Sequence, residues 1–186
     1  MLARIVAFVA KHAGKERSTT IRILSLMLGA FGFLVVVPIT LAIVGHLIAA
    51  YVTINVSRVV ELLLGVAGVS LGLFFLAWSI WAFWFVGRGT PVPFASPTRL
   101  VTNGPFRYTR NPIKLGAILF YFGMGTICDH LVTGLIMLAV GVSLGTIYHK
   151  AVEEKELVIR FGKEYEEYRK RTSFLIPLPP RNSRVV

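Results

Sequence analysis

Charged residues are scarce in this sequence of 186 residues. Asp, Glu, Lys and Arg make up 16% of the chain, whereas hydrophobic residues make up 55% and the mean hydropathy is +0.70. A soluble domain carries roughly a quarter charged residues. The shortage of charge therefore argues against an ordinary soluble domain and indicates a protein that lies within a membrane.

Cysteine is also scarce. Cys128 is the one cysteine of the chain, so no disulfide bond can form within it. No CxxC motif or paired-histidine motif of the kind that binds zinc is present, and the histidines are scattered: His12, His46, His130 and His149. We therefore predict that the protein holds no metal ion.

Acidic residues are few in comparison with basic ones. The chain has 9 Asp and Glu against 20 Lys and Arg, which gives a net charge of +11 and an isoelectric point near 10.3. In a soluble protein this balance would favour binding to nucleic acid. Here the basic residues flank the apolar runs, where they set membrane topology and meet anionic lipid head groups. We predict membrane lipids as partners and no nucleic acid.

Four runs of the chain lack any charged residue: 23–57, 62–87, 115–128 and 131–148. About 20 apolar residues are needed to span a bilayer, and the first two runs exceed that length. The last two are shorter and are separated only by Asp129 and His130. They predict two antiparallel spans joined by a tight turn.

The first charge-free run is too long for one straight span. As a single helix it would be about 50 Å long, and Pro38 and Gly45 lie inside it. It fits one kinked or overlong span, or two short spans. The sequence of the run itself leaves these possibilities open.

The distribution of Lys and Arg favours the single span. The N-terminal segment has five, the 87–111 loop four and the tail from Lys150 onward nine, while the intervening connections have one and none. Cytoplasmic segments are rich in Lys and Arg. We therefore expect an all-α, multi-pass integral membrane bundle, one domain over 1–186, with both termini cytoplasmic. The expected spans are 21–50, 59–87, 112–128 and 131–149.

An amphipathic helix is predicted after the last span, over residues 150–171. One face of it would carry residues that recur at spacings of three and four: Glu154, Val158, Phe161, Tyr165 and Tyr168. Gly162 interrupts this pattern and predicts a bend. A shorter amphipathic segment is expected on the membrane surface at residues 2–13.

Small residues recur at helical spacing in the apolar runs. The pentapeptide Gly-Val-Ser-Leu-Gly occurs twice, at Gly68–Gly72 and at Gly141–Gly145. Both copies have the small-xxx-small spacing that lets membrane helices approach closely. We interpret them, and the Gly123–Gly125 segment, as helix-packing sites rather than nucleotide-binding loops.

Two polar clusters border the predicted hairpin. The segment Arg107–Pro112 directly precedes the third span, and Glu153 and Glu154 directly follow the fourth. Because the hairpin returns to the same side of the membrane, we expect Arg110 and the glutamate pair to be neighbours. Opposite charges at the edge of a membrane bundle indicate a functional site. The alternative is a set of topogenic charges with a salt bridge at a helix end.

The first polar cluster lies in a longer motif. Residues 100–112 read LVTNGPFRYTRNP and are followed by Leu115 and Gly116. They resemble the signature of the isoprenylcysteine carboxyl methyltransferases and related phospholipid methyltransferases, Gly-Pro-aromatic-Arg-Tyr-x-Arg-(His or Asn)-Pro, then an aromatic and Leu-Gly. Residues 153–177 resemble a second block of that family, so the resemblance covers about residues 87–177. Lys114 stands where the family usually has Tyr.

The resemblance implies transfer of a methyl group from S-adenosylmethionine to a lipid or lipidated acceptor, most like the O-methylation of a prenylcysteine carboxylate. It implies Arg110 and Glu154 as catalytic residues. Arg110 would hold the donor's carboxylate through a bidentate contact, and the glutamates would meet its cationic end. The implied cofactor-binding residues are Tyr108, Arg110, Asn111, Gly116, Glu153 and Glu154.

Three other functions remain open. A phospholipid N-methyltransferase acting on phosphatidylethanolamine would use the same residues, with Glu154 as the base that its protonated amine needs. An NADPH-dependent membrane reductase shares a related C-terminal architecture. A catalytically inactive member of the family is the third possibility, which the substitution at Lys114 keeps open. The choice between O-, N- and S-methylation and the oligomeric state also stay open.

An aromatic face on the second span predicts where an apolar acceptor would bind. Its members recur at helical spacing: Phe74, Trp78, Trp81 and Phe85. Tryptophan near the membrane interface ordinarily serves as an anchor, which is the alternative interpretation. We expect an acceptor with a long apolar part.

Overall fold

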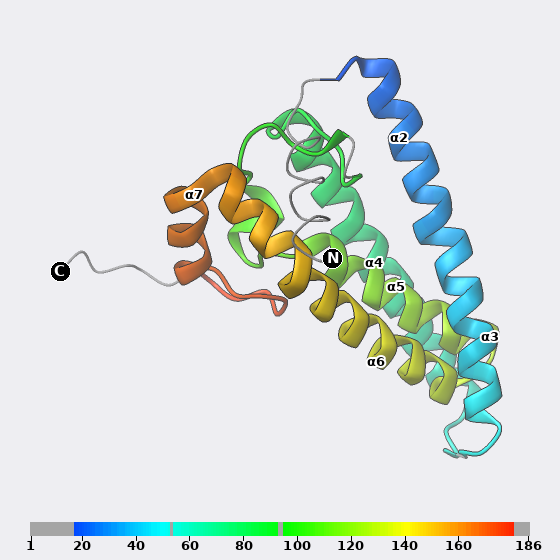
Figure 1. Cartoon of the computed structure of the whole chain (residues 1–186). Coiled ribbons are helices and arrows are strands. Elements are labelled where there is room, and N and C mark those ends of the chain that lie inside the picture. Colours follow the sequence, from blue (N-terminus) through cyan, green and yellow to red (C-terminus); the bar gives the residue numbers. More distant parts are fainter. Residues whose placement is uncertain (1–16, 53, 93–94, 181–186) are drawn as a thin grey trace. The chain divides into compact units, whose positions relative to one another are not determined.

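A computed structural model describes residues 17–52, 54–92 and 95–180 of the protein (Figure 1). Over these residues the regular structure is helical, apart from an isolated bridge between Thr109 and Ser173. The all-α fold predicted from the sequence is confirmed. The amphipathic segment expected at residues 2–13 lies outside the described residues.

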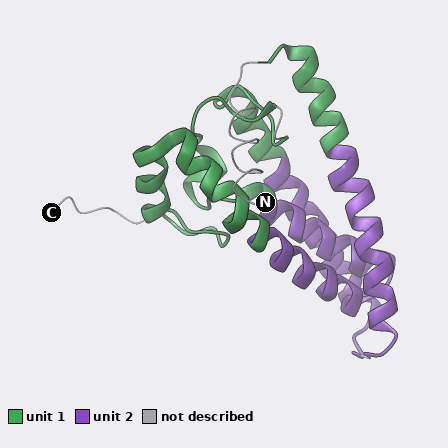
Figure 2. Cartoon of the chain, viewed as in Figure 1, with its two compact units in different colours: residues 1–29, 77–113, 147–186 green, residues 30–76, 114–146 purple. Residues whose placement is uncertain are grey.

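The chain forms two compact units, each built from segments that are distant in sequence (Figure 2). Unit 1 contains residues 1–29, 77–113 and 147–186, and unit 2 contains residues 30–76 and 114–146. The residues of the two predicted polar clusters, 107–112 and 153–154, all belong to unit 1. The prediction of a single domain is not tested by this division and stays a prediction.

The first helical run passes through a proline without ending. It consists of α2 (Thr19–Phe31), a π-helical turn η1 (Gly32–Val36) and α3 (Val37–Ala49). Pro38 has no N–H, and its ring crowds the carbonyl four residues earlier. The wider π turn just before it relieves this conflict, because the Val37 N–H reaches the Gly32 carbonyl instead. The overlong span is therefore one continuous helical run.

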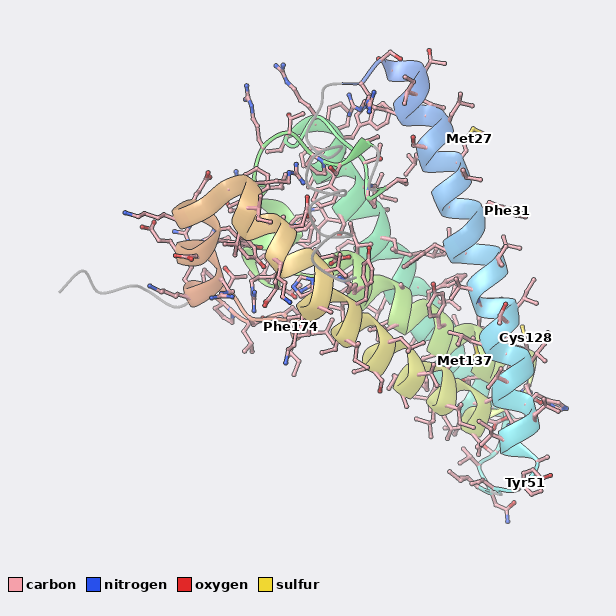
Figure 3. The ribbon with its side chains drawn as sticks, in the orientation of Figure 1. Met27, Phe31, Tyr51, Cys128, Met137 and Phe174 are labelled. Carbon is pink, nitrogen blue, oxygen red and sulfur yellow. The ribbon has the colours of Figure 1, made fainter. Side chains whose placement is uncertain are left out.

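Three helical runs in the described part of the chain are long and apolar enough to cross a membrane. They are Thr19–Ala49, α4 (Arg58–Phe85) and the run that begins with α6 (Leu131–Tyr148), while α5 (Pro112–Cys128) is a shorter apolar helix. The four ranges expected from the sequence agree with these helices within two residues at each end. Large apolar side chains such as Met27 and Phe31 on α2 are exposed, as lipid-facing residues are (Figure 3).

Glycines bring α4 and α5 together within unit 2. A Cβ atom on Gly72 would lie 2.6 Å from the backbone nitrogen of Phe120 and 2.7 Å from the carbonyl oxygen of Gly116. One on Gly123 would lie 2.5 Å from the carbonyl oxygen of Gly65. Real Cβ atoms essentially never approach within 3.0 Å, so these positions require glycine. The helix-packing interpretation is confirmed for Gly72 and for Gly123.

The second Gly-Val-Ser-Leu-Gly copy, in α6, has looser surroundings. A Cβ atom on Gly141 would lie 3.4 Å from a side-chain carbon of Ile118, and one on Gly145 would lie 3.8 Å from Lys114. These are ordinary van der Waals distances. The second copy faces α5, and its glycines are not required by close approach.

A charged pair at the start of α4 holds the α5–α6 turn. Glu61 accepts a hydrogen bond from the Leu131 N–H at 2.8 Å and is paired with Arg58 at 3.0 Å. Arg58 donates to backbone carbonyls at the end of α5 and in the turn, namely those of Thr126, Ile127 and Asp129. Helix ends leave such groups without intrahelical partners. The anion at the N-terminus of α6 and the cation at the C-terminus of α5 also match the helix dipoles.

The tail forms the predicted amphipathic helix. α6 continues through a second π-helical turn, η4 (His149–Glu153), into α7 (Glu154–Arg171). Gly162 breaks α7 with φ 51° and ψ −128°, which confirms the expected bend. Tyr165 and Tyr168 are buried and pack with residues of unit 1 that include Ala82, Val101 and Phe106. This contact orients α7 so that its first turn borders the polar segment before α5.

Candidate active site

The segment before α5 is fixed by the chain that follows α7. Thr109 and Ser173 form a parallel bridge, and the backbone N–H of Arg110 donates to the Ser173 carbonyl at 2.9 Å. The Leu178 N–H donates to the Tyr108 carbonyl at 3.0 Å. Backbone hydrogen bonds on both sides of Arg110 therefore set the direction of its side chain. This pairing was not predicted from the sequence.

Phe174 lies in the chain after α7 (Figure 3), and its backbone carbonyl orders the next residues of the motif. The buried Thr109 donates its hydroxyl to this carbonyl at 3.1 Å and accepts the Asn111 N–H at 3.2 Å. The side-chain amide of Asn111 donates to the same carbonyl at 3.0 Å, and its nitrogen lies 3.5 Å from Nε2 of His149. Asn111 is thus held directly beside an imidazole.

Arg110 and Glu154 are neighbours, as expected from the hairpin. Nη1 of Arg110 donates to Oε1 of Glu154 at 2.8 Å, and the two side chains are 11% and 19% exposed. The other carboxylate oxygen, Oε2, lies 3.7 Å from Arg169. The same Nη1 of Arg110 lies 3.4 Å from the hydroxyl of Tyr165. Burial raises the pKa of this phenol and Arg110 only partly offsets the effect, so Tyr165 is a neutral acceptor.

One donor of Arg110 is left over. Its Nε atom is buried and has no hydrogen-bond partner among the residues that the structure describes. Burying an N–H without a partner costs about 1–3 kcal/mol. A guanidinium that keeps an unsatisfied donor beside a single carboxylate is well suited to receive an anionic group from a ligand.

Glu153 contacts a residue that was not predicted from the sequence to belong to the site. Its carboxylate lies 2.7 Å from Nδ1 of His149, and Nε2 of the same ring lies 3.6 Å from Glu154. The His149 side chain is only 2% exposed, and its ring centroid is 5.1 Å from that of Phe174. His149 precedes Glu153 by four residues, the spacing of neighbours on a helix. That spacing alone could have indicated that His149 lies beside Glu153.

Two other predicted residues have different surroundings. The Tyr108 ring lies 6.3 Å from that of Trp78, and Tyr108 is 38% exposed. Gly116 belongs to unit 2, whereas the other five predicted cofactor-binding residues belong to unit 1. A Cβ on Gly116 would lie 2.8 Å from the Gly72 carbonyl. The structure gives Gly116 a role in helix contact, and its role in cofactor binding stays a prediction.

Unit 1 therefore assembles a site of mixed charge where the segment before α5 meets η4 and the first turn of α7. A guanidinium with a spare donor lies against one carboxylate, and a buried imidazole lies between that carboxylate and a second one. Such a set can bind a ligand that carries both an anionic and a cationic group.

Comparisons with known proteins point to one family. Residues 60–164, more than half of the chain, match the model of the phospholipid methyltransferase family. Methanethiol S-methyltransferase 1 of Bradyrhizobium diazoefficiens is 31% identical over 83 residues, which are 45% of this chain and 28% of that protein. Methanethiol S-methyltransferase of Mycobacterium tuberculosis is 27% identical over 78 residues, which are 42% of this chain and 30% of that protein. The chain thus matches less than a third of the length of either relative. No solved structure matches it.

Proposed function

We propose that this chain, which belongs to the phospholipid methyltransferase family, is a membrane-embedded methyltransferase that uses S-adenosylmethionine. The observation that carries the proposal is the pairing of Arg110 with Glu154 at 2.8 Å, with Nε of Arg110 buried and unpartnered among the described residues. The matched family names a methyl-transfer reaction, and this site has the charges that the donor requires.

The residues of the site fit S-adenosylmethionine. The donor carries a carboxylate, an ammonium group and a sulfonium group, so it needs both an anion-binding and a cation-binding partner. The unpartnered Nε–H of Arg110 suits the carboxylate, because a guanidinium binds carboxylates through parallel N–H donors. Glu153 and Glu154 suit the cationic groups. S-adenosylmethionine, when bound, supplies a methyl group on a positively charged sulfur.

The protein's own contribution would be mainly positioning. Arg110 is fixed by backbone hydrogen bonds and by Glu154, so it meets a ligand without having to reorganise. Tyr165 and Tyr168 anchor α7 beside the motif and exclude water from its inner face. Holding two reactants in line while excluding water accounts for much of the acceleration of a displacement reaction.

The acceptor would reach the site from the membrane. Trp81 and Phe85 on α4 are 54% and 65% exposed, and Trp78 lies beside Tyr108. This exposed aromatic surface is where an apolar acceptor dissolved in lipid would first meet unit 1. The resemblance of the motif favours a prenylcysteine carboxylate or phosphatidylethanolamine. The names of the two relatives add a thiol to these acceptors.

The orientation in the membrane is part of the proposal. The two sequence segments that hold the site lie in the 87–111 loop, which has four Lys and Arg, and in the tail from Lys150 onward, which has nine. Segments rich in Lys and Arg are cytoplasmic. Both termini would then be cytoplasmic, together with the donor site. A reporter that is active only in the cytoplasm should be active both when it is fused before Met1 and when it is fused after Val186. An external reporter signal at either terminus would contradict this orientation.

Ligand binding by the purified protein in detergent tests the proposed activity. We expect saturable binding of S-adenosylmethionine and no binding of NADPH, followed by methyl transfer to at least one acceptor among N-acetyl-farnesylcysteine, phosphatidylethanolamine and an alkyl thiol. Binding of NADPH without S-adenosylmethionine would instead identify a reductase. Binding of S-adenosylmethionine without transfer to any of the three acceptors would identify an inactive member of the family.

A further inference from the structure

Unit 1 carries arginines that the candidate site does not use (Figure 2). Its segments 17–29 and 77–113 contain two and four arginines respectively, and neither segment contains aspartate or glutamate. Arg22 lies on α2, while Arg88 and Arg99 lie in the loop that follows α4. We call these three residues the arginine patch. The two segments that hold it supply positive charge only.

Arg22 joins the first turn of α2 to the last turn of α4. Its Nη2 donates to the Trp84 carbonyl at 2.8 Å, and its guanidinium carbon lies 3.9 Å from the centre of the Trp84 ring. Arginine and tryptophan at the ends of apolar helices are typical of the membrane surface. Nε of Arg22 is buried and has no hydrogen-bond partner within the described part of the chain. A ligand that supplies an acceptor would remove the cost of this unpartnered N–H.

Arg88 has a backbone conformation that glycine adopts more easily. Its φ is 52°, and the other positive φ angles among the described residues belong to glycines. It lies just after α4, where the Gly89 N–H donates to the Phe83 carbonyl at 2.9 Å. The left-handed residue at such a helix end is usually glycine, and a residue with a Cβ is strained there. The side chain of Arg88 is exposed, so the strain points to a use for this side chain outside the folded core.

A fold in the loop brings Arg99 beside Arg88. The Gly87 carbonyl accepts hydrogen bonds from the N–H and the hydroxyl of Thr98, at 2.9 Å and 3.3 Å. A Cβ atom on Gly87 would lie 2.8 Å from the Cβ of Pro97, so this approach requires glycine. Arg88 and Arg99 directly follow the two bonded residues, and both are exposed. Two arginines thus extend from adjacent segments of backbone at the end of α4.

An ion pair ties α7 to the same loop. Arg160 donates to the Pro97 carbonyl and is paired with Glu156 at 2.6 Å. The two side chains are 10% and 9% exposed. Their charges cancel, so this contact with α7 adds no net charge to the loop. The positive charge of the arginine patch is therefore not offset there.

We propose that the arginine patch binds the phosphate of an anionic phospholipid head group. The patch lies where two apolar helices end, which is the level of lipid phosphates, and arginine binds phosphate oxygens through paired N–H donors. Anionic lipids also attract basic residues at the membrane surface. Phosphatidylglycerol represents this class. It has no amine, thiol or carboxylate that could receive a methyl group, so the inference goes beyond the proposed function and does not depend on it.

Lipid titration of the purified protein in a neutral detergent, followed by native mass spectrometry, tests the patch. We expect the wild type to bind one phosphatidylglycerol molecule about tenfold more tightly than phosphatidylcholine, whose head group has no net charge. Arg88→Gln and Arg99→Gln should each weaken this binding about fivefold, the effect of one basic residue beside an anionic surface. The control is Lys163→Gln, which removes an exposed positive charge of α7 outside the patch and should change the affinity less than about twofold.

Arg88→Gly separates lipid binding from a structural role. Glycine relieves the strain at a φ of 52°. In lipid-free detergent the midpoint of thermal unfolding of this variant should therefore equal or exceed that of the wild type, while its affinity for phosphatidylglycerol falls as in Arg88→Gln. A lower midpoint together with unchanged lipid affinity would overturn the proposal, because Arg88 would then serve the fold alone.

Two further comparisons identify the ligand and the donor. Arg22→Lys keeps the charge but lacks the Nε–H, so it should weaken phosphatidylglycerol binding about tenfold, as expected for a lost hydrogen bond to a charged group. Glycerol 3-phosphate and inorganic phosphate should not compete with the lipid at equal concentration, because they lack the acyl chains that hold a head group at the membrane surface. Competition by either soluble phosphate, equal binding of phosphatidylcholine, or wild-type affinity in Arg22→Lys would overturn the proposal.

Discussion

Arg110→Ala is expected to weaken binding of S-adenosylmethionine by about 100-fold, and Arg110→Lys by at least about 10-fold, since hydrogen bonds to charged groups contribute roughly 1.5–3 kcal/mol. In the structure Nη1 is used by Glu154 and Tyr165, while Nε remains available as a second, separately directed donor. A lysine ammonium is a compact charge and cannot hold Glu154 while presenting a planar pair of donors to a carboxylate. The dissociation constant in detergent, measured by calorimetry, gives the result directly.

A nearby arginine of the same motif provides the matched control. Arg107 is exposed and lies three residues before Arg110, so Arg107→Lys should leave donor affinity within about twofold, as expected for surface substitutions. Glu154→Gln should also weaken binding, because it removes the partner of Arg110 and an anion that would face the donor's cationic end. Wild-type affinity in both Arg110→Lys and Glu154→Gln would show that the pair is only a structural salt bridge.

Gly72→Ala is expected to destabilise the protein by about 1–3 kcal/mol, the usual effect of forcing an extra group into a filled contact. The added Cβ would lie 2.6 Å from the Phe120 nitrogen and 2.7 Å from the Gly116 oxygen. Both are backbone atoms of α5, so the whole helix must move to make room. The midpoint of thermal unfolding in detergent should fall by several degrees.

Gly145→Ala is the matched control, since Gly72 and Gly145 end identical pentapeptides. A Cβ on Gly145 would be 3.8 Å from Lys114, at ordinary contact distance. Alanine also favours helix relative to glycine by about 0.5–1 kcal/mol, so Gly145→Ala should be neutral or slightly stabilising. Equal loss of stability in the two variants would contradict the tight α4–α5 contact at Gly72.

Most of the helical framework was predictable because charge marks its boundaries. Glu61 and Arg58 near the start of α4, and Asp129 and His130 between α5 and α6, interrupt runs that are otherwise apolar. Such runs can satisfy their backbone groups in a bilayer only as helices. What the pattern could not predict is the pair of π-helical turns, at 32–36 and 149–153. Those depend on local steric conflict and on contacts, to which the hydropathy pattern is insensitive.

The candidate site was partly predictable for a different reason. A short hairpin returns its two ends to one side, so the neighbourhood of Arg110 and Glu154 followed from connectivity. The role of the chain after α7 did not follow from connectivity. Ser173 and Phe174 order the motif through their backbone carbonyls, and every residue type has a backbone carbonyl. Sequence therefore carries almost no signal for such contacts.

The sequence by itself determined the helical membrane fold, the positions of the apolar helices and the placement of Arg110 next to Glu154. Those features follow from hydropathy, charge and connectivity, which are properties of segments. Only the tertiary structure decided which of two identical glycine pentapeptides is tightly packed and that His149 lies between Glu153 and Glu154. These depend on which atoms of distant segments meet. A residue's type restricts what it can contact, but its neighbours are set by the folded chain.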